Sequence, residues 1–203
     1  MKITKKIIYF LSVFPLLSCQ YTTFAQEKLK NNEVKGRDNL YIETVIYNKK
    51  GSANSKYFEN KKYNLSEIHK QRVPDSPGAS FLIYRLNSHE AFINAFYNSF
   101  SQERITNLSK QNLDFEVNFV LDKKGKILGI AFRISGESDI SVFEIESLEK
   151  ELETNITFQP IGRSGKEYPG EYPVRTSFKE IEQGKVNAIL NQDERIDNWY
   201  IFK

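Results

Sequence analysis

The clearest alternation of apolar and polar residues lies between residues 114 and 121. In the segment DFEVNFVL the odd positions are apolar and most even positions are polar, which is the period of a strand with one buried face. The turn-forming residues DKKG follow at 122–125, and a glycine can take the positive φ that a tight turn needs. The segment KILGIAFRIS then has a second strand pattern, so residues 114–135 are predicted to form a β-hairpin.

Two further segments have the apolar spacing of amphipathic helices. The first is capped by Asn87 or Ser88, and the second by Ser138 or Asp139. The predicted buried residues are Ala91, Phe92, Ala95 and Phe96 in the first helix, and Val142, Ile145, Leu148 and Leu152 in the second. The second helix also carries glutamates at positions 144, 146, 149, 151 and 153. Paired carboxylates can act as acid and base, but we interpret these as the solvated face of the helix.

The remaining elements are shorter. Strands are predicted at 39–48, 81–86, 156–159 and 172–178, a helix at 179–190, helix or loop at 101–112, and exposed loops at 74–78 and 162–169. Mixed short strands and single helices predict an α+β fold, with a small antiparallel sheet packed on one or two helices. We place a boundary at the start of the hairpin. It separates an N-terminal α+β segment over 38–113 from a second domain over 114–203.

The first residues have the pattern of an export signal. Lys2, Lys5 and Lys6 precede an apolar run over residues 7–17. That run is too short for a helix across the roughly 30 Å hydrocarbon core of a bilayer, and its order of charged, apolar and small residues is typical of a signal peptide. The sequence therefore predicts a signal peptide over 1–18 or 1–25, and a protein that works outside the cytoplasm.

Two processing sites fit this signal. Leu16-Leu17-Ser18-Cys19 resembles a lipobox, in which Cys19 becomes the acylated first residue, whereas Thr23-Phe24-Ala25 resembles an ordinary cleavage site. We favour lipidation of Cys19, because the one cysteine of the chain directly follows the apolar run. We expect the mature protein in the periplasm of a Gram-negative-type bacterium, or held at one of its membranes by the lipid anchor. Residues 26–37 are polar and are predicted to be a flexible tether.

Charge and composition narrow the range of partners. The chain is 39% hydrophobic and 27% charged, as folded globular proteins are. Of 29 Lys and Arg residues, the three in the signal are removed, which leaves 26 against 26 Asp and Glu. A neutral mature protein has no general attraction to nucleic acid or to anionic lipid. We expect no nucleic-acid partner, and membrane contact only through the anchor.

Motifs for catalysis or metal binding are missing from the sequence. His69 and His89 are far apart, and neither has a second ligand three or four residues away. The segment GRSGK at 162–166 lacks the spacing of a phosphate-binding loop, and there is no G-x-S-x-G. We therefore predict no catalytic, cofactor-binding or metal-binding residues and no cofactor, and the sequence favours a protein without enzymatic activity.

Residues 114–179 resemble the carboxy-terminal domain of the TonB family. The residues that carry this resemblance are Phe115-x-Val117-x-Phe119-x-Leu121-Asp122-x-x-Gly125-Lys126-Ile127, Ile156-Thr157-Phe158-Gln159-Pro160, Gly165-Lys166 and Tyr172-Pro173-Val174-Arg175-Thr176-Ser177-Phe178. The resemblance implies a hairpin, a helix and a second hairpin, in a periplasmic domain that binds an extended segment of an envelope protein by strand addition. Energy-transducing members also have a membrane-spanning helix and a long proline-rich spacer, which this chain lacks.

The resemblance leads to a first hypothesis for function: a non-enzymatic module that binds another envelope protein through a sheet edge. The expected contact residues lie in the strand at 172–178 and the loop before it; they are Arg163, Lys166, Tyr168, Tyr172 and Arg175. Two alternatives remain open. One is a periplasmic hydrolase with His69 or His89 beside a carboxylate in a pocket, and the other is a small-ligand or glycan-binding module that uses exposed tyrosines and Trp199.

Overall fold

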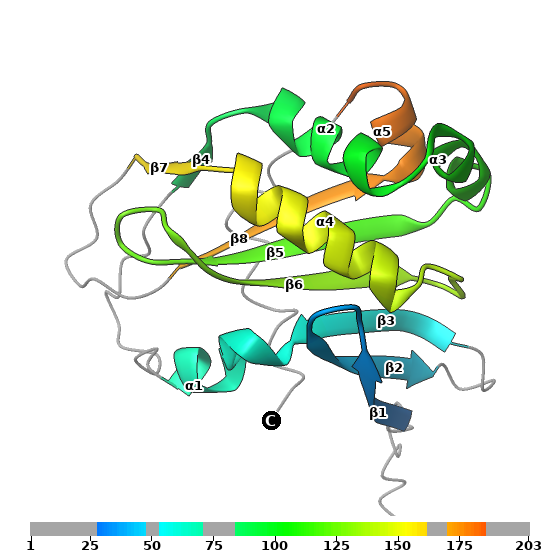
Figure 1. Cartoon of the computed structure of the whole chain (residues 1–203), viewed down its shortest axis with the longest axis horizontal. Helices are drawn as coiled ribbons and strands as arrows, with labels where there is room; N and C mark the ends of the chain where they lie inside the picture. Colours follow the sequence, from blue (N-terminus) through cyan, green and yellow to red (C-terminus); the bar gives the residue numbers. More distant parts are fainter. Residues whose placement is uncertain (1–27, 48–52, 71–83, 162–169, 186–203) are drawn as a thin grey trace, which may run out of the picture.

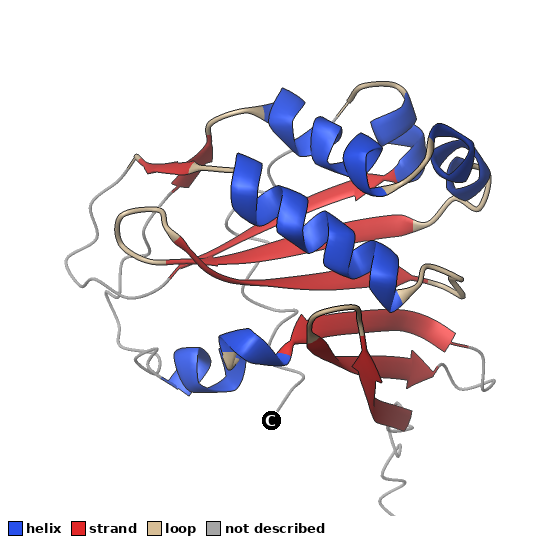
Figure 2. Ribbon diagram, viewed as in Figure 1, coloured by secondary structure: helices blue, strands red, loops and turns tan. Residues whose placement is uncertain are grey.

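A computed structural model of the chain describes residues 28–47, 53–70, 84–161 and 170–185, without the side chains of residues 28, 29, 53, 69 and 70. The strands are β1 (Lys28–Lys35), β2 (Leu40–Tyr47), β3 (Ala53–Asn60), β4 (Tyr84–Leu86), β5 (Asp114–Leu121), β6 (Ile127–Ser135), β7 (Phe158–Pro160) and β8 (Gly170–Ser177). The helices are η1 (Lys61–Tyr63), α1 (Leu65–Lys70), α2 (His89–Ser99), α3 (Gln102–Ser109), α4 (Val142–Asn155) and α5 (Phe178–Glu182). The predicted α+β class is confirmed (Figure 2).

One antiparallel sheet joins both halves of the chain. It has six strands in the order β1-β2-β3-β6-β5-β8, and β4 and β7 form a separate two-stranded sheet. The predicted hairpin is confirmed as β5 and β6, with Phe115 opposite Ile134 and Phe119 opposite Ile130. Because β3 pairs with β6, the segment over 38–113 and the segment over 114–203 share one sheet.

Helices α2, α3, α4 and α5 lie on one face of this sheet (Figure 1). The apolar residues of β5 point to that face, where Phe115 packs edge-on against Phe96 of α2 and Phe178 of α5, with ring centroids 5.4 Å and 5.7 Å apart. All three rings are at most 1% exposed. Burial of one such side chain contributes about 1.5–3 kcal/mol, so these contacts hold the helices on the sheet.

Local capping determines where the helices begin. Ser88 caps α2, as predicted, and its side chain accepts the N–H of Ala91. The prediction of Ser138 or Asp139 as the cap of α4 is wrong. Ser141 is the cap, because its hydroxyl and Glu144 form a reciprocal capping box.

Residues 101–112 contain a true helix, α3, capped by Ser101. Its apolar residues Ile105 and Leu108 are fully buried, which explains why a mostly polar segment is helical. Of the helix predicted at 179–190, the described residues form only the short α5. Its residues Phe178 and Ile181 are buried.

Two other predictions fail because they ignored pairing between distant segments. The flexible tether predicted at 26–37 is wrong for Lys28–Lys35, which forms β1 and pairs with β2 along its whole length. The second hairpin predicted from 156–159 and 172–178 is also wrong. There, β7 pairs with β4, while β8 pairs with β5. Strand β3, at 53–60, had no clear signal in the sequence, because its polar residues Lys56, Glu59 and Asn60 obscure the alternation.

Gly125 allows a prediction about the β5–β6 turn. Its φ is +83°, and a Cβ at this position would collide with the backbone carbonyl of Phe158. Gly184 is a matched control, because it has a similar φ of +66° but a Cβ added there would meet no atom of the described residues within 4 Å. We expect Gly184→Ala to lower the free energy of unfolding by about 1 kcal/mol, from backbone strain alone. Gly125→Ala should cost at least about 2 kcal/mol, because β7 must also move.

Urea unfolding followed by circular dichroism measures both values. Equal losses for the two variants would show that the contact between the turn and β7 does not constrain the fold.

Candidate interaction surface

The predicted contact residues divide into described and undescribed positions. Arg163, Lys166 and Tyr168 lie outside the described residues, as do the predicted lipidation site Cys19, the signal peptide and both processing sites. Tyr172 and Arg175 lie in β8.

Tyr172 points into the protein. It is 5% exposed, and its ring packs edge-on against Phe158 with centroids 5.1 Å apart. Because β5 and β8 pair in register, Tyr172 lies opposite Phe119 on the face that the helices cover. The prediction that Tyr172 contacts a partner is therefore wrong, and its role is to pack the core.

Arg175 lies on the opposite face and is accessible. Its side chain is 43% exposed, and its Nε donates to Glu116 Oε2 at 2.6 Å across the β5–β8 pair. The Glu116 side chain is only 6% exposed, so the guanidinium neutralises a carboxylate that would otherwise be buried with its charge unpaired.

The backbone of β8 has one edge on β5, and β8 is the last strand of the sheet in the described part of the chain. Alternate residues of an antiparallel strand direct both N–H and C=O to the same side. The N–H of Ser177 donates to Glu180 Oε2 at 2.9 Å, so it points away from β5. By alternation the backbone groups of Arg175 and Pro173 also point to the outer edge.

The position of Pro173 agrees with this geometry, and Pro173 also limits the backbone groups that the edge can offer. A proline has no N–H to donate, so within a sheet it is tolerated where its nitrogen faces an edge. The edge of β8 then offers the N–H and C=O of Arg175 but only the C=O of Pro173. An interrupted edge of this kind pairs less readily with arbitrary strands, which leaves the part around Arg175 as the place for a specific contact.

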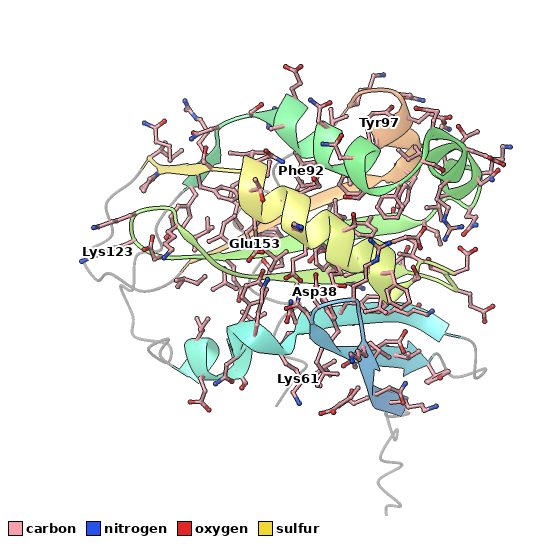
Figure 3. The ribbon with its side chains drawn as sticks, in the orientation of Figure 1. Asp38, Lys61, Phe92, Tyr97, Lys123 and Glu153 are labelled. Atoms are coloured by element: carbon pink, nitrogen blue, oxygen red, sulfur yellow. The ribbon has the colours of Figure 1, made fainter. Side chains whose placement is uncertain are left out.

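The glutamates of α4 make a second polar site, and here the sequence interpretation was wrong. Glu146 and Glu149 are 7% and 1% exposed, so they are not part of a solvated face. Glu146 accepts the backbone N–H groups of Arg37, Asp38 (3.0 Å) and Asn39 (2.7 Å) in the β1–β2 turn, together with the Asn39 side chain. Figure 3 labels Asp38 in this turn and Glu153 further along α4.

Glu149 is the centre of the same contact. Its carboxylate accepts hydrogen bonds from Tyr41 Oη (3.0 Å), Asn60 Nδ2 (2.7 Å) and Tyr63 Oη (2.9 Å), and pairs with Lys62 Nζ at 2.7 Å. These donors come from β2, β3 and η1. One buried carboxylate thus joins three elements of the N-terminal segment to α4.

The titration behaviour of this cluster is that of a structural network. Burial, and next the charge of Glu149, raise the pKa of both Tyr41 and Tyr63 well above the ordinary value for a tyrosine. Burial alone would lower the pKa of Lys62, but its bonds to Glu149 and Glu153 outweigh it and raise that pKa. Both phenols therefore remain protonated donors, and the lysine remains charged. None of these three groups is prepared to act as a general base near neutral pH.

Part of this cluster could have been found in the sequence. Positions 146, 149 and 153 follow the i, i+3, i+7 spacing of one helix face, next to the apolar stripe of Leu148 and Leu152. The donors on β2, β3 and η1 could not be found, because pairing in a sheet and contact across 86 to 109 residues leave no local signal.

Arg104 makes a similar link between α3 and the start of α4. Its Nε is 2.7 Å from Glu144 Oε1, and its Nη1 is 3.0 Å from Asp139 Oδ2. Hydrogen bonds with Asp139 and then Glu144 raise the pKa of Arg104, and the bond from Arg104 lowers the pKa of Asp139. These two ion pairs of Arg104 explain why α3, with only two buried residues, keeps its position.

Of the two histidines, only His89 has a described side chain. His89 is exposed at the first position of α2, and His69 lies in α1. Within residues 28–47, 53–70, 84–161 and 170–185, no three His, Cys, Asp or Glu side chains are placed to hold a metal ion. None of the helices in those ranges is both long and apolar enough to cross a membrane.

Comparison with known proteins adds a likeness of fold. Neither a protein-family model nor a curated protein sequence matches the chain. The structure is similar to that of a DUF5043 family protein from Bacteroides uniformis, with a TM-score of 0.55 and 13% sequence identity. The alignment covers 73% of this chain and 85% of that chain. At this identity the likeness shows a shared fold and assigns no role to any residue.

The Glu149 network predicts a difference between two glutamates of one helix. Glu149 and Glu153 both bind Lys62 and Tyr63, but their side chains are 2% and 34% exposed. Glu149→Gln should lower the free energy of unfolding by about 2 kcal/mol or more, because it leaves buried donors poorly matched. Glu153→Gln should cost less than about 1 kcal/mol. Urea unfolding at neutral pH measures the loss in each variant. Comparable losses would contradict the prediction that burial makes Glu149 more important for stability than Glu153.

Glu146 predicts a dependence of stability on pH. Burial alone would raise its pKa, but the hydrogen bonds from Arg37, Asn39 and Asp38 outweigh burial and hold the pKa below the ordinary value of 4.5. A lowered folded-state pKa stabilises the fold above the unfolded pKa, and this stabilisation is lost as pH falls through the folded pKa. Glu146→Gln should therefore be less stable than the unmodified protein at neutral pH, and this difference should shrink below about pH 4.5.

Thermal unfolding between neutral and acidic pH measures this difference. Glu153→Gln is the control, and we expect its difference from the unmodified protein to change less over the same range. A gap for Glu146→Gln that stays constant down to acid pH would contradict the prediction.

Proposed function

We propose that this protein is exported to the cell envelope and acts as a non-enzymatic interaction module, which binds an extended segment of another envelope protein along the outer edge of β8. The observation that carries the proposal is the position of β8 at the end of the sheet, with the backbone groups of Arg175 directed away from β5. A partner strand would extend the sheet by one strand there.

Export is supported by the sequence. The basic residues, the apolar run and the small residues before position 26 follow the order of a signal peptide. Acylated Cys19 would hold the domain at a membrane surface, and a free N-terminus at Gln26 would release it. The mass of the mature protein distinguishes these two products.

Strand addition also agrees with the chemistry of the described residues. Pairing of this kind depends on main-chain hydrogen bonds and needs few particular side chains. The polar clusters around Glu149 and Arg104 are occupied by contacts within the protein. The exposed position of His89 gives no specific support to a hydrolase. The burial of Tyr172 removes one aromatic side chain from a glycan-binding surface.

Two substitutions at Arg175 separate backbone from side-chain contacts. Arg175→Ala removes the guanidinium and keeps the outward N–H, whereas Arg175→Pro removes both. Because this N–H points away from β5, the proline does not break the β5–β8 ladder. We expect proline to abolish partner capture from envelope extracts, and alanine to weaken it by less than about tenfold. Circular dichroism checks that both variants fold.

Hydrogen exchange in the purified complex gives the direct readout. Strand addition should slow exchange of the Arg175 amide, while the amides of Val174 and Thr176, which face β5, are already protected in the free protein. Equal binding by the two variants, or an Arg175 amide that exchanges at the same rate in both states, would rule out this edge as the binding site.

A further inference from the structure

A row of polar side chains crosses the second face of the sheet, which is the face opposite the helices α2 to α5. The strand registers place four residues directly opposite one another on the neighbouring strands β3, β6, β5 and β8; they are Tyr57, Arg133, Glu116 and Arg175. Each has a chain neighbour in the hydrophobic core, namely Phe58, Phe132, Val117 and Val174. Alternation along the strands therefore directs the row to the second face. The row ends at Arg175, on the outermost of these strands.

The charges of this row alternate in sign. Glu116 lies between Arg133 and Arg175, and its side chain is only 6% exposed. It accepts the hydrogen bond from Arg175 Nε at 2.6 Å. The guanidinium of Arg133 instead lies over the ring of Tyr57, with its carbon 5.6 Å from the ring centre, and its Nε has no partner among the described residues. One buried carboxylate thus stands between two arginines, and the row carries an excess positive charge.

Two further carboxylates lie diagonal to the row. Asp114 precedes Glu116 by two residues on β5, and Glu59 follows Tyr57 by two residues on β3. Among the described residues, neither forms an ion pair with an arginine of the row. Asp114 is exposed, so water and salt screen its charge. Burial raises the pKa of Glu59, which reduces its negative charge. The excess positive charge therefore remains, and Arg175 brings it to the edge of the sheet.

Arg175 can bind a second carboxylate while it keeps Glu116. Its side chain is 43% exposed, and Nε is the atom that donates to Glu116. The N–H groups of its Nη atoms have no acceptor among the described residues. A strand added along the outer edge of β8 would place one of its side chains directly opposite Arg175 on the same face, with the two Cβ atoms about 4.5–5.5 Å apart.

We propose that the segment bound along β8 carries an aspartate or glutamate at the position opposite Arg175. This inference rests on the proposed strand addition and names the chemistry of the partner. An acidic side chain there continues the alternation of charge and can accept from the Nη groups of Arg175. A lysine or arginine at that position would oppose a like charge, which destabilises a cross-strand pair. The backbone of β8 thus holds the added strand, and the charged row selects its sequence.

Three short peptides test this preference on the mature protein. They have the sequence Thr-Thr-Val-X-Val-Thr-Thr with blocked ends, where X is glutamate, glutamine or lysine. NMR titration and hydrogen exchange, both read at the Arg175 amide, measure their binding. We expect the glutamate peptide to bind about three- to fivefold more tightly than the glutamine peptide, and the lysine peptide to bind most weakly. The ratio should fall as salt is raised from about 0.01 M to about 1 M, because the Debye length shortens from about 30 Å to about 3 Å.

Variants assign the preference to the row. Arg175→Gln should remove it, so that the three peptides bind within about twofold of one another. Glu116→Gln should increase it, because the positive charge of the row is then larger. Arg85→Gln is the control, since Arg85 is an exposed arginine of β4 outside the six-stranded sheet, and it should change nothing. If Arg175→Gln does not fold because Glu116 loses its partner, the double variant Glu116→Gln/Arg175→Gln removes both charges and should also bind the three peptides within about twofold.

This inference and the proposed function fail in different ways. If all three peptides slow exchange of the Arg175 amide and bind equally, strand addition is retained and the acidic preference is overturned. Tightest binding by the lysine peptide, or a preference for glutamate that persists in Arg175→Gln, also overturns it. If none of the peptides slows exchange of the Arg175 amide, strand addition along this edge is excluded, and the acidic preference is excluded with it.

Discussion

The arrangement of this protein depends on one helix that is buried on two sides. The apolar residues Ile145, Leu148 and Leu152 of α4 face the core, where each is fully buried. A second stripe on the same helix, Glu146 and Glu149, is buried against the N-terminal strands and receives donors from β2, β3, η1 and the β1–β2 turn. A buried carboxylate without partners is strongly destabilising. The position of α4 on the sheet is therefore stable only with the donors of the N-terminal segment in place.

This requirement explains why the two halves of the chain are not separate units. Strand β3 pairs with β6 and continues the sheet, and its last residue, Asn60, donates to Glu149 from α4. The sheet ladder and the carboxylate network thus fix the same strand from two directions. Lys62 and Tyr63, which follow at once in η1, complete the network. Loss of the network would leave β1, β2 and β3 attached through backbone pairing with β6 and through the core packing of Tyr41 and Phe58.

The same construction leaves a sheet edge available and buries polar residues on the second face of the sheet. Each end of an open sheet carries backbone groups with no neighbouring strand, and at β8 these are restricted by Pro173 and by the capping of Ser177. The second face of the sheet is different, because its polar residues come from several strands and are brought together only by register. Arg133 and Asn118 are 15 residues apart in the chain and are diagonal neighbours in the β5–β6 ladder. An edge therefore favours recognition of backbone groups.

Local sequence determined the elements whose signal lies within a few residues. The period of two over residues 114–135 specifies the β5–β6 hairpin, and the apolar stripes specify the helices α2 and α4, because each pattern repeats within one element. Tertiary structure alone decided that β8 pairs with β5 and β7 with β4, that Lys28–Lys35 is a strand, and that Tyr172 is buried. It also decided that Glu149 is buried and not solvated. Whether a polar side chain is solvated or buried depends on donors elsewhere in the chain, and strand pairing depends on contacts between distant segments, so neither leaves a periodic trace in the residues themselves.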